Sequence, residues 1–460
     1  MKTILLSAFT LILISLCSSC KKNDNENHDG PKIYTVHIDP AVTFQKMVGF
    51  GGSLTWYSDR IITSPYKNQI CQLLFEDLGT DIIRLKNWYY PAGYPVEKSP
   101  DVMESSGIKT LFGTTNQLHQ LAMHYNPNIL TLLSSWSPPS ALKSNNNLNN
   151  GTLKKQDGVF MYEAFADYWV DVLDHIPFNP EYLSIQNEPT WVTDSWETCA
   201  WRPVEMDGFP SYETAFDLVY DRISTRTDPP GLIGPESANI GTSAFGGNTF
   251  GVFCNVLKDK PYLNMYGFHT YNFSAETPLA ETKPLLNMIR DEYGNKPSVM
   301  TEFSAFPWMK TAQYMIQVIN EAHASGYIYW EMVWAETNSK AMIQIDQAGN
   351  YTITPFFHVM KHFAGNIDHE YVRVDASMEI TSVYHTAFLD PGGHSITLVM
   401  VNPLTTDVRV NFSVNDKSIT AVKAIQSEED NFYRELPDLA PGSHVVLKPE
   451  SVTTVILDVE

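Results

Sequence analysis

The chain has few cysteines and none of the spacings that hold structural metal ions. Only five cysteines occur in 460 residues. Beyond residue 20 they are Cys71, Cys199 and Cys254, too few and too far apart for a disulfide framework. No Cys-x-x-Cys pair, His-Glu-x-x-His helix or EF-hand loop follows residue 20, so a metal site has no support in the sequence.

Phosphate-binding loops and basic side chains are scarce as well. Gly49-Phe50-Gly51-Gly52 lacks the rest of a dinucleotide-binding fingerprint, and no Walker lysine occurs, so we expect no cofactor. The 31 Lys and Arg face 52 Asp and Glu, which gives a formal net charge of −21. Nucleic-acid affinity rests on basic residues that neutralise phosphates. We therefore expect no nucleic-acid partner and favour an uncharged ligand.

The N-terminus carries an apolar run that is too short to span a bilayer. Lys2 precedes Ile4–Leu16, thirteen largely apolar residues, which is the pattern of an export signal. Ser18-Ser19-Cys20 resembles a bacterial lipobox, although Cys17 stands where an aliphatic residue is usual. We expect residues 1–19 to be a signal peptide, Cys20 to be lipidated and residues 20–31 to form a flexible tether.

The polar tether resembles the surface-export signals of Bacteroidetes lipoproteins. This resemblance implies an outer-membrane lipoprotein anchored through its lipid at the cell surface. A periplasmic or an extracellular protein is the alternative. We expect the protein to be a monomer.

Eight short apolar runs alternate with amphipathic stretches across residues 47–365. The predicted strands are Met47–Ser53, Asp81–Leu85, Ile129–Ser135, Tyr182–Asn187, Gly231–Pro235, Met265–His269, Pro297–Thr301 and Gly326–Trp330. The predicted helices are Tyr66–Leu78, Thr114–Tyr125, Phe160–His175, Ser211–Thr225, Thr249–Leu257, Leu279–Tyr293, Thr311–Ala324 and Pro355–Phe363. Such alternation implies parallel βαβ units, and eight pairs predict a (β/α)₈ TIM barrel of the α/β class.

After residue 365 the apolar pattern changes to the alternation of antiparallel strands. The runs are Ser382–Leu389, Ser395–Asn402, Val408–Phe412, Ile419–Ile425 and Val452–Val459. We therefore predict a β-sandwich side domain over residues 366–460. Residues 32–46 alternate in the same way and are expected to join that sandwich as an N-terminal strand.

Two predicted barrel strands end in glutamates, at the face where barrel enzymes have their active sites. The fourth strand ends in Gln186-Asn187-Glu188-Pro189 and the seventh in Thr301-Glu302. Hydrolysis of a glycosidic bond uses two carboxyl groups, one to protonate the departing oxygen and one to stabilise the developing positive charge. Glu236 and Glu331 are rival carboxylates on the fifth and eighth strands; we assign Glu331 no role.

In its ordered set of motifs the chain resembles glycoside hydrolase family 30, a family of retaining barrel glycosidases. The motifs are Gly49–Ser53, Ser134–Pro139, Gln186–Pro189, Gly234–Ser237, His269–Tyr271, Thr301-Glu302, Tyr329-Trp330 and Phe357–Phe363. The resemblance implies that Glu188 is the general acid/base and Glu302 the nucleophile, with Glu236 a supporting hydrogen-bond acceptor.

Further residues follow from their placement beside these two glutamates. Arg84 and Tyr271 are expected to keep Glu302 ionised, and Asn187 is expected to donate to the sugar 2-hydroxyl. Trp136 and Trp330 offer flat faces for sugar rings, with core packing as the alternative. His269 leaves the sixth strand toward the same mouth and is either a substrate contact or a structural histidine.

The matched motifs favour cleavage of a plant or microbial polysaccharide, with an endo-β-1,4-xylanase acting by double displacement as the first choice. A β-1,6-glucanase, a galactanase or a β-glucosidase-type enzyme of the same family is the nearest alternative. In the loop after the eighth strand only Lys340 is basic, which argues against a strict need for an acidic branch on the substrate. A non-catalytic glycan-binding surface lipoprotein is the alternative from another class.

Overall fold

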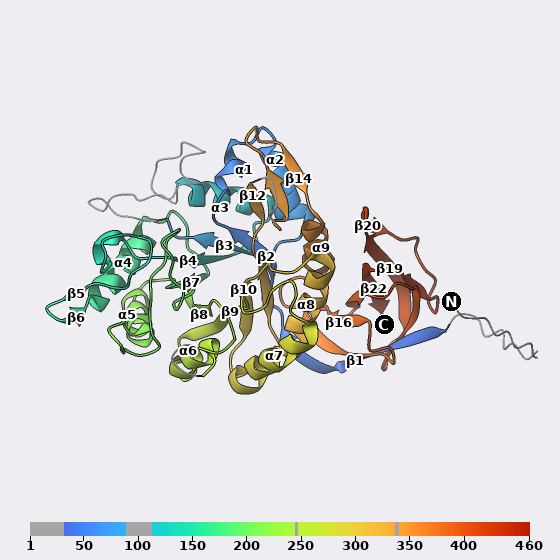
Figure 1. Cartoon of the computed structure of the whole chain (residues 1–460). Helices are drawn as coiled ribbons and strands as arrows, with labels where there is room; N and C mark the ends of the chain where they lie inside the picture. Colours follow the sequence, from blue (N-terminus) through green and yellow to red (C-terminus); the bar gives the residue numbers. More distant parts are fainter. Residues whose placement is uncertain (1–31, 89–112, 244–246, 336–339) are drawn as a thin grey trace, which may run out of the picture. The chain divides into compact units, whose positions relative to one another are not determined.

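The computed structural model describes residues 32–88, 113–243, 247–335 and 340–460 (Figure 1). The expected signal peptide, Cys20 and the tether to residue 31 lie outside the described residues. Within the described ranges, no helix combines the length and apolar character needed to cross a membrane.

Eight parallel strands close into a barrel in the order β10-β11-β2-β3-β4-β7-β8-β9. Their bounds are β2 (Gly49–Leu54), β3 (Ile82–Lys86), β4 (Leu130–Ser134), β7 (Tyr182–Ser184), β8 (Gly231–Ser237), β9 (Leu263–His269), β10 (Ser298–Glu302) and β11 (Gly326–Tyr329). The predicted TIM barrel is therefore confirmed. Each predicted strand overlaps an observed one.

Alternation along the strands decides which side chains enter the barrel. Ile82 of β3 belongs to a small buried cluster that draws one side chain from each of six strands, whereas Ile83 packs in the large outer core. Because side chains alternate along a strand, Arg84 points to the same side as Ile82, but closer to the carboxyl end. The apolar cluster thus fills the middle of the barrel. The charged side chain of Arg84 lies in the next layer toward the carboxyl ends of the strands.

The helices surround this barrel (Figure 1). They are α1 (Asp59–Thr63), α2 (Lys67–Gln72), α3 (Gly113–Tyr125), α4 (Tyr162–His175), α5 (Tyr212–Ile223), α6 (Thr249–Leu257), α7 (Leu279–Tyr293), α8 (Trp308–Glu321) and α9 (Pro355–Ala364). Three start at side-chain caps of the expected type: Ser211 accepts from the amide of Thr214, Asn248 from that of Gly251, and Thr354 from that of Phe356. The predicted helix over 66–78 is α2 followed by a π-helical turn, Leu73–Asp77.

The C-terminal region forms a nine-stranded sheet that includes one strand from the N-terminal side of the barrel. Its order is β20-β19-β22-β17-β16-β15-β1-β18-β21. The strands are β1 (Ile33–Lys46), β15 (Val372–Ser377), β16 (Tyr384–Leu389), β17 (Ser395–Asn402), β18 (Val408–Val414), β19 (Ile419–Glu428), β20 (Asn431–Glu435), β21 (Val445–Leu447) and β22 (Ser451–Val459). The expected contribution of the N-terminal segment to this domain is confirmed.

The sheet folds over on itself around its own apolar core. Gln426 of β19 donates to the carbonyl of Val446 in β21 at 2.9 Å, so strands near opposite edges of the sheet meet. The domain attaches to the barrel through α9, where the two ring nitrogens of buried His362 bond the hydroxyls of Thr454 and Ser427, each at 2.8 Å. This contact is distant in sequence from the strand-end glutamates.

Two small sheets interrupt the barrel pattern. β5 (Lys155–Gln156) pairs with β6 (Val159–Phe160), and β12 (Val333–Ala335), β13 (Ile343–Ile345) and β14 (Tyr351–Ile353) form a three-stranded sheet. The second sheet follows β11 directly. It therefore holds the chain after the eighth barrel strand beside the carboxyl end of the barrel.

Candidate active site

The two glutamates singled out by the motifs meet at the carboxyl end of the barrel. Glu302 is the last residue of β10, and Glu188 lies four residues beyond the end of β7. Glu188 has a φ of 47°, and its amide donates to the carbonyl of Glu236 at 3.0 Å. One carboxylate oxygen of each glutamate and a ring nitrogen of His269 all lie within 4.8 Å of one another.

Arg84 organises the cluster from its place on β3. The side chain is fully buried. Its Nη1 donates to Glu302 Oε2 at 2.7 Å, its Nη2 to Asn187 Oδ1 at 2.5 Å, and its Nε lies 3.0 Å from Glu236 Oε1. A buried guanidinium is costly unless carboxylates pair with it, and here two of them do.

Glu302 receives hydrogen bonds on both oxygens. Besides Arg84 on Oε2, the hydroxyl of Tyr271 donates to Oε1 at 2.9 Å. Burial raises the pKa of Glu302 above its ordinary value, while the charge and hydrogen bond of Arg84 oppose that rise. Donors on both oxygens favour the ionised form and fix the orientation of the carboxylate.

Glu188 lies in a different environment. Burial raises its pKa from 4.5 to about 7, with Glu236 adding to the rise and Arg84 opposing it. Its Oε1 lies 2.9 Å from Nδ1 of His269, which is fully buried. Burial lowers the pKa of His269 to about 4, so this ring is neutral near pH 7. Of the two glutamates, Glu188 and Glu302, Glu188 is therefore the one that carries a proton.

Glu236 is the partner of Arg84 on the side away from Glu302. Burial by itself would raise the pKa of Glu236, but the charge of Arg84 holds it below the ordinary value. A carboxylate that remains ionised here balances the guanidinium charge. The supporting role that the family resemblance suggested agrees with this contact.

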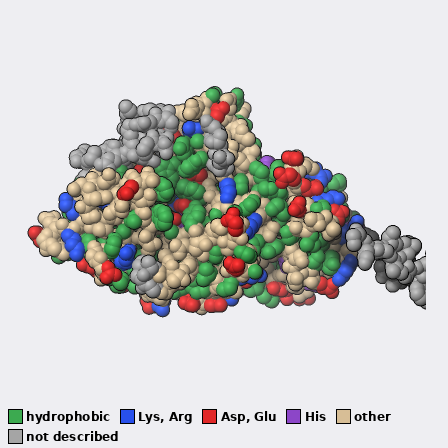
Figure 2. Space-filling view, viewed as in Figure 1, with side chains coloured by type: hydrophobic (Ala, Val, Ile, Leu, Met, Phe, Trp, Pro, Cys, Tyr) green, Lys and Arg blue, Asp and Glu red, His purple; other side chains and the backbone are tan. Residues whose placement is uncertain are grey.

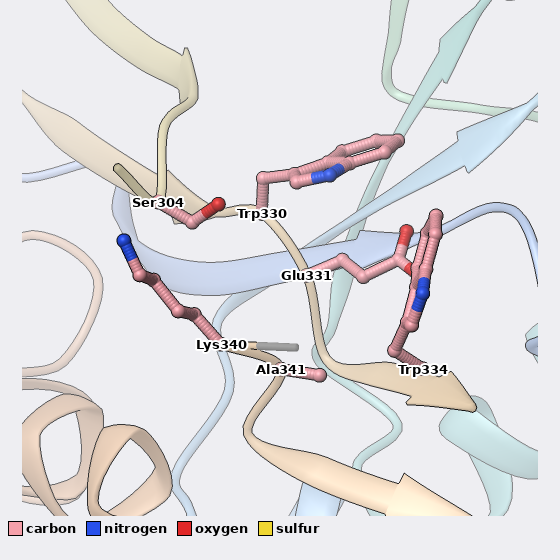
Figure 3. A pocket seen from close by; sticks show the side chains of 6 residues that line it. All are labelled: Ser304, Trp330, Glu331, Trp334, Lys340 and Ala341. Carbon is pink, nitrogen blue, oxygen red and sulfur yellow. The ribbon is translucent and has the colours of Figure 1, made fainter. Parts of the chain in front are cut away.

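The two tryptophans with predicted sugar contacts differ in exposure. Trp136 is 3% exposed, and its ring covers the guanidinium of Arg84 at 4.6 Å. Trp330 is half-buried and lines a pocket (Figure 3). Both belong to an aromatic cluster whose other rings are Trp56, Trp88, Tyr57 and Trp334. Trp136 thus packs over Arg84, whereas Trp330 lines a pocket, and a sugar contact of either indole stays a prediction.

Sequence reasoning missed a second buried cation near the same end of the barrel. Lys86, two residues after Arg84, is fully buried and lies 3.0 Å from Glu197 Oε1. Its ammonium sits 3.3 Å from the ring centre of Trp88 and 4.8 Å from that of Trp56. The two-residue spacing on one strand could have suggested that Lys86 faces inward as Arg84 does.

Glu188, His269 and Glu302 are also the described residues whose ligand atoms could surround a metal ion. The guanidinium of Arg84 already places a positive charge 2.7 Å from Glu302. A second cation at this position would be repelled by it. The arrangement is better suited to moving a proton than to binding a metal.

The charged side chains on the face in Figure 2 lie mainly toward its margins. Acidic groups are numerous along the lower edge and over the C-terminal sheet, whereas hydrophobic side chains gather in the middle of the barrel face. A surface of this kind offers little attraction to a polyanion.

Comparisons with known proteins connect this geometry to glycoside hydrolases. No family model matches the chain. A lysosomal acid glucosylceramidase of Mus musculus is 23% identical over 427 residues, which is 82% of this chain and 79% of that protein. A family 30 subfamily 8 xylanase of Clostridium acetobutylicum superposes with a TM-score of 0.69 at 20% identity, covering 92% of this chain and 99% of that one. An endo-β-1,6-glucanase gives 0.69 at 15% identity, covering 92% and 94%.

These findings show which proteins this chain resembles in fold and in sequence. The fold is that of barrel glycoside hydrolases with an appended β domain. The likeness to glycoside hydrolase family 30 that the motifs predicted is confirmed by the solved structures and agrees with the sequence relative.

Proposed function

We propose that the protein is a retaining glycoside hydrolase in which Glu302 is the nucleophile and Glu188 the general acid/base. The observation that carries the proposal is the approach of their carboxylate oxygens to within 4.8 Å. Retaining enzymes place the two carboxyl groups about 5–5.5 Å apart, whereas inverting enzymes need about 6.5–9.5 Å to admit a water molecule. The short separation favours direct attack by a carboxylate.

The first half-reaction uses the difference between the two environments. Glu302, held by Arg84 and Tyr271, attacks the anomeric carbon as Glu188 transfers its proton to the departing oxygen. The bond from the anomeric carbon to that oxygen breaks, and an ester forms with Glu302. Nδ1–H of His269 donates to Oε1 of Glu188 in this scheme, which leaves Oε2 to carry the proton.

The second half-reaction returns the same groups to their starting states. Glu188, now ionised, takes a proton from a water molecule while the water oxygen attacks the anomeric carbon. The ester bond breaks, and Glu302 leaves as a carboxylate. Arg84 fixes Oδ1 of Asn187 as an acceptor. The amide N–H₂ of Asn187 is then the donor for the sugar 2-hydroxyl, a hydrogen bond that strengthens in the transition state.

The substrate we propose is β-xylan cleaved internally at β-1,4 linkages. Similarity to xylanases supports this choice, and the similarity to an endo-β-1,6-glucanase keeps β-1,6-glucan as the second candidate. The net charge of −21 favours an uncharged polymer. We also propose that the protein acts as a monomer, anchored through Cys20 to the outer membrane.

The test is chemical rescue of Glu188→Ala. This variant should lose the polymer as a substrate but keep turnover of aryl β-glycosides with good leaving groups, and azide should accelerate it and yield a β-glycosyl azide. Glu281→Gln, on the exposed side of α7, is the matched control and should behave as wild type. The substrate panel is β-xylan, β-1,6-glucan and β-galactan, with the anomer of the first product followed by proton NMR.

Two results would contradict the proposal. Full activity of Glu188→Ala on the natural polymer would exclude its role as the acid. A wild-type protein that binds polysaccharide yet never releases sugar would instead support the non-catalytic glycan-binding alternative.

A further inference from the structure

A pocket of about 180 Å³ opens beside the nucleophile, between the ends of β10 and β11 (Figure 3). It is lined by Ser304, Trp330, Glu331, Trp334, Lys340 and Ala341. Ser304 lies two residues beyond Glu302, and Trp330 and Glu331 follow β11 directly. In a retaining mechanism the sugar that becomes bonded to the nucleophile occupies the space next to Glu302, so a pocket at the ends of these two strands is a candidate place for the glycone.

Glu331 enters this pocket with one oxygen satisfied and the other not. The side chain is 2% exposed, and the hydroxyl of Thr55 donates to its Oε2 at 2.7 Å. Its Oε1 has no hydrogen-bond partner among the described residues. Figure 3 shows the carboxyl group reaching between the indoles of Trp330 and Trp334. A buried polar atom without a partner is unfavourable, and one that lines a pocket can gain a hydrogen bond from a bound ligand.

The surroundings of Glu331 favour its uncharged form. Burial raises its pKa well above the ordinary value, and the charge of Glu302 adds to this, while Thr55 and Arg84 act in the opposite direction. The cation in the pocket wall, Lys340, directs its ammonium to the carbonyl of Ala305. Because Oε2 already accepts from Thr55, a proton on Oε1 gives Glu331 a hydrogen-bond donor that lacks an acceptor.

We propose that Glu331 hydrogen-bonds a hydroxyl of the glycone sugar, so that this pocket selects an uncharged pyranose held between Trp330 and Trp334. The inference rests on the proposed function, since it needs a glycone seated against Glu302. A sugar hydroxyl accepts from Oε1, and the two indoles cover the apolar parts of the ring. The contacts of the pocket therefore bind the glycone, the sugar that forms the ester with Glu302.

The experiment compares Glu331→Ala with wild type on an aryl β-glycoside and on its series of monodeoxy analogues. Glu331→Ala should lower kcat/KM on the parent glycoside about tenfold, the usual scale for one lost hydrogen bond in a dry site. One analogue, which lacks the partner hydroxyl, should be slow with wild type and no slower with the variant. On each of the other deoxy analogues, Glu331→Ala should again have a kcat/KM about tenfold below that of wild type. The control variant Glu281→Ala should match wild type on every substrate.

The outcomes separate the inference from the proposed function. An equal loss on every analogue, or no loss on any, would overturn the role of Glu331 while leaving the hydrolase in place. A wild-type protein that cleaves none of the glycosides would overturn the proposed function itself. If Glu331→Ala does not fold, Glu331→Leu keeps the volume of the side chain and permits the same comparison. Glu331→Gln should recover part of the rate, because its amide can donate.

Discussion

Replacing Glu188 with glutamine should make the protein more stable at alkaline pH while removing its activity on polymers. The reason is the environment of this carboxyl group. Burial raises the pKa of Glu188 from 4.5 to about 7, whereas in the unfolded chain the group returns to its ordinary value. Between these two values the folded protein binds more protons than the unfolded one, so its free energy of unfolding falls as pH rises.

The size of the effect follows from the two pKa values. Above pH 7, the ionised Glu188 costs the folded state about 3 kcal/mol, because each pKa unit corresponds to about 1.4 kcal/mol. At pH 5 the cost is below about 1 kcal/mol, because the folded group stays protonated and pH 5 lies only about half a unit above the pKa of 4.5 in the unfolded chain. Glutamine carries no charge at either pH. Its side-chain oxygen can still accept the hydrogen bond from His269, so the packing of the site is preserved.

Urea unfolding of wild type and Glu188→Gln at pH 5 and pH 8 measures this difference. The gain in free energy of unfolding should approach about 3 kcal/mol at pH 8 and shrink to less than about 1 kcal/mol at pH 5. Glu281→Gln, an exposed control, should change little at either pH. A variant that is no more stable than wild type at pH 8, or equally more stable at both pH values, would refute the argument that burial keeps a proton on Glu188.

Two further results are expected. Tyr271→Phe removes a donor from the Glu302 carboxylate, so the pKa of Glu302 should rise and the acidic limb of the kcat/KM profile should move to higher pH; an unchanged acidic limb would show that Tyr271 does not hold the ionised form. Cys20→Ala should shift the protein from the outer-membrane fraction to the soluble fraction and abolish labelling with a radioactive fatty acid, while a variant that remains in the membrane fraction would contradict anchoring at Cys20.

The barrel was predictable because parallel strands are buried on both faces and appear as short apolar runs. The ends of the strands were harder to predict. The fourth strand is predicted to extend to Asn187, but the ladder ends at Ser184 and the chain turns so that Glu188 adopts a left-handed conformation. Strand β15 was missed because Arg373 and Asp375 interrupt its apolar pattern. The three-residue strands β12–β14 are too short for any period to be recognised.

The sequence was enough to identify the charged residues at the strand ends as candidates for the site. It was not enough to predict which of them contact each other. The sequence places Arg84 at the end of one strand and Glu236 at the end of another, and only the closed barrel shows that they form an ion pair. The pairing of Lys86 with Glu197 joins the last residue of β3 to a residue in the segment between β7 and α5, and it has no local signal. The same holds for Thr55 and Glu331, whose hydrogen bond spans 276 positions of the chain.

Arg84 explains how two carboxyl groups so close together can keep different protonation states. Its planar guanidinium donates directly to Glu302 and to Asn187 and lies against Glu236, and within the described part of the chain none of its hydrogen bonds goes to Glu188. Glu302 is thus stabilised as an anion by direct donors, whereas Glu188 feels the charge of Arg84 only at a distance, too weakly to offset the effect of burial on its pKa. A lysine at this position would supply the charge but not the fork of donors, and the asymmetry that leaves the proton on Glu188 would weaken.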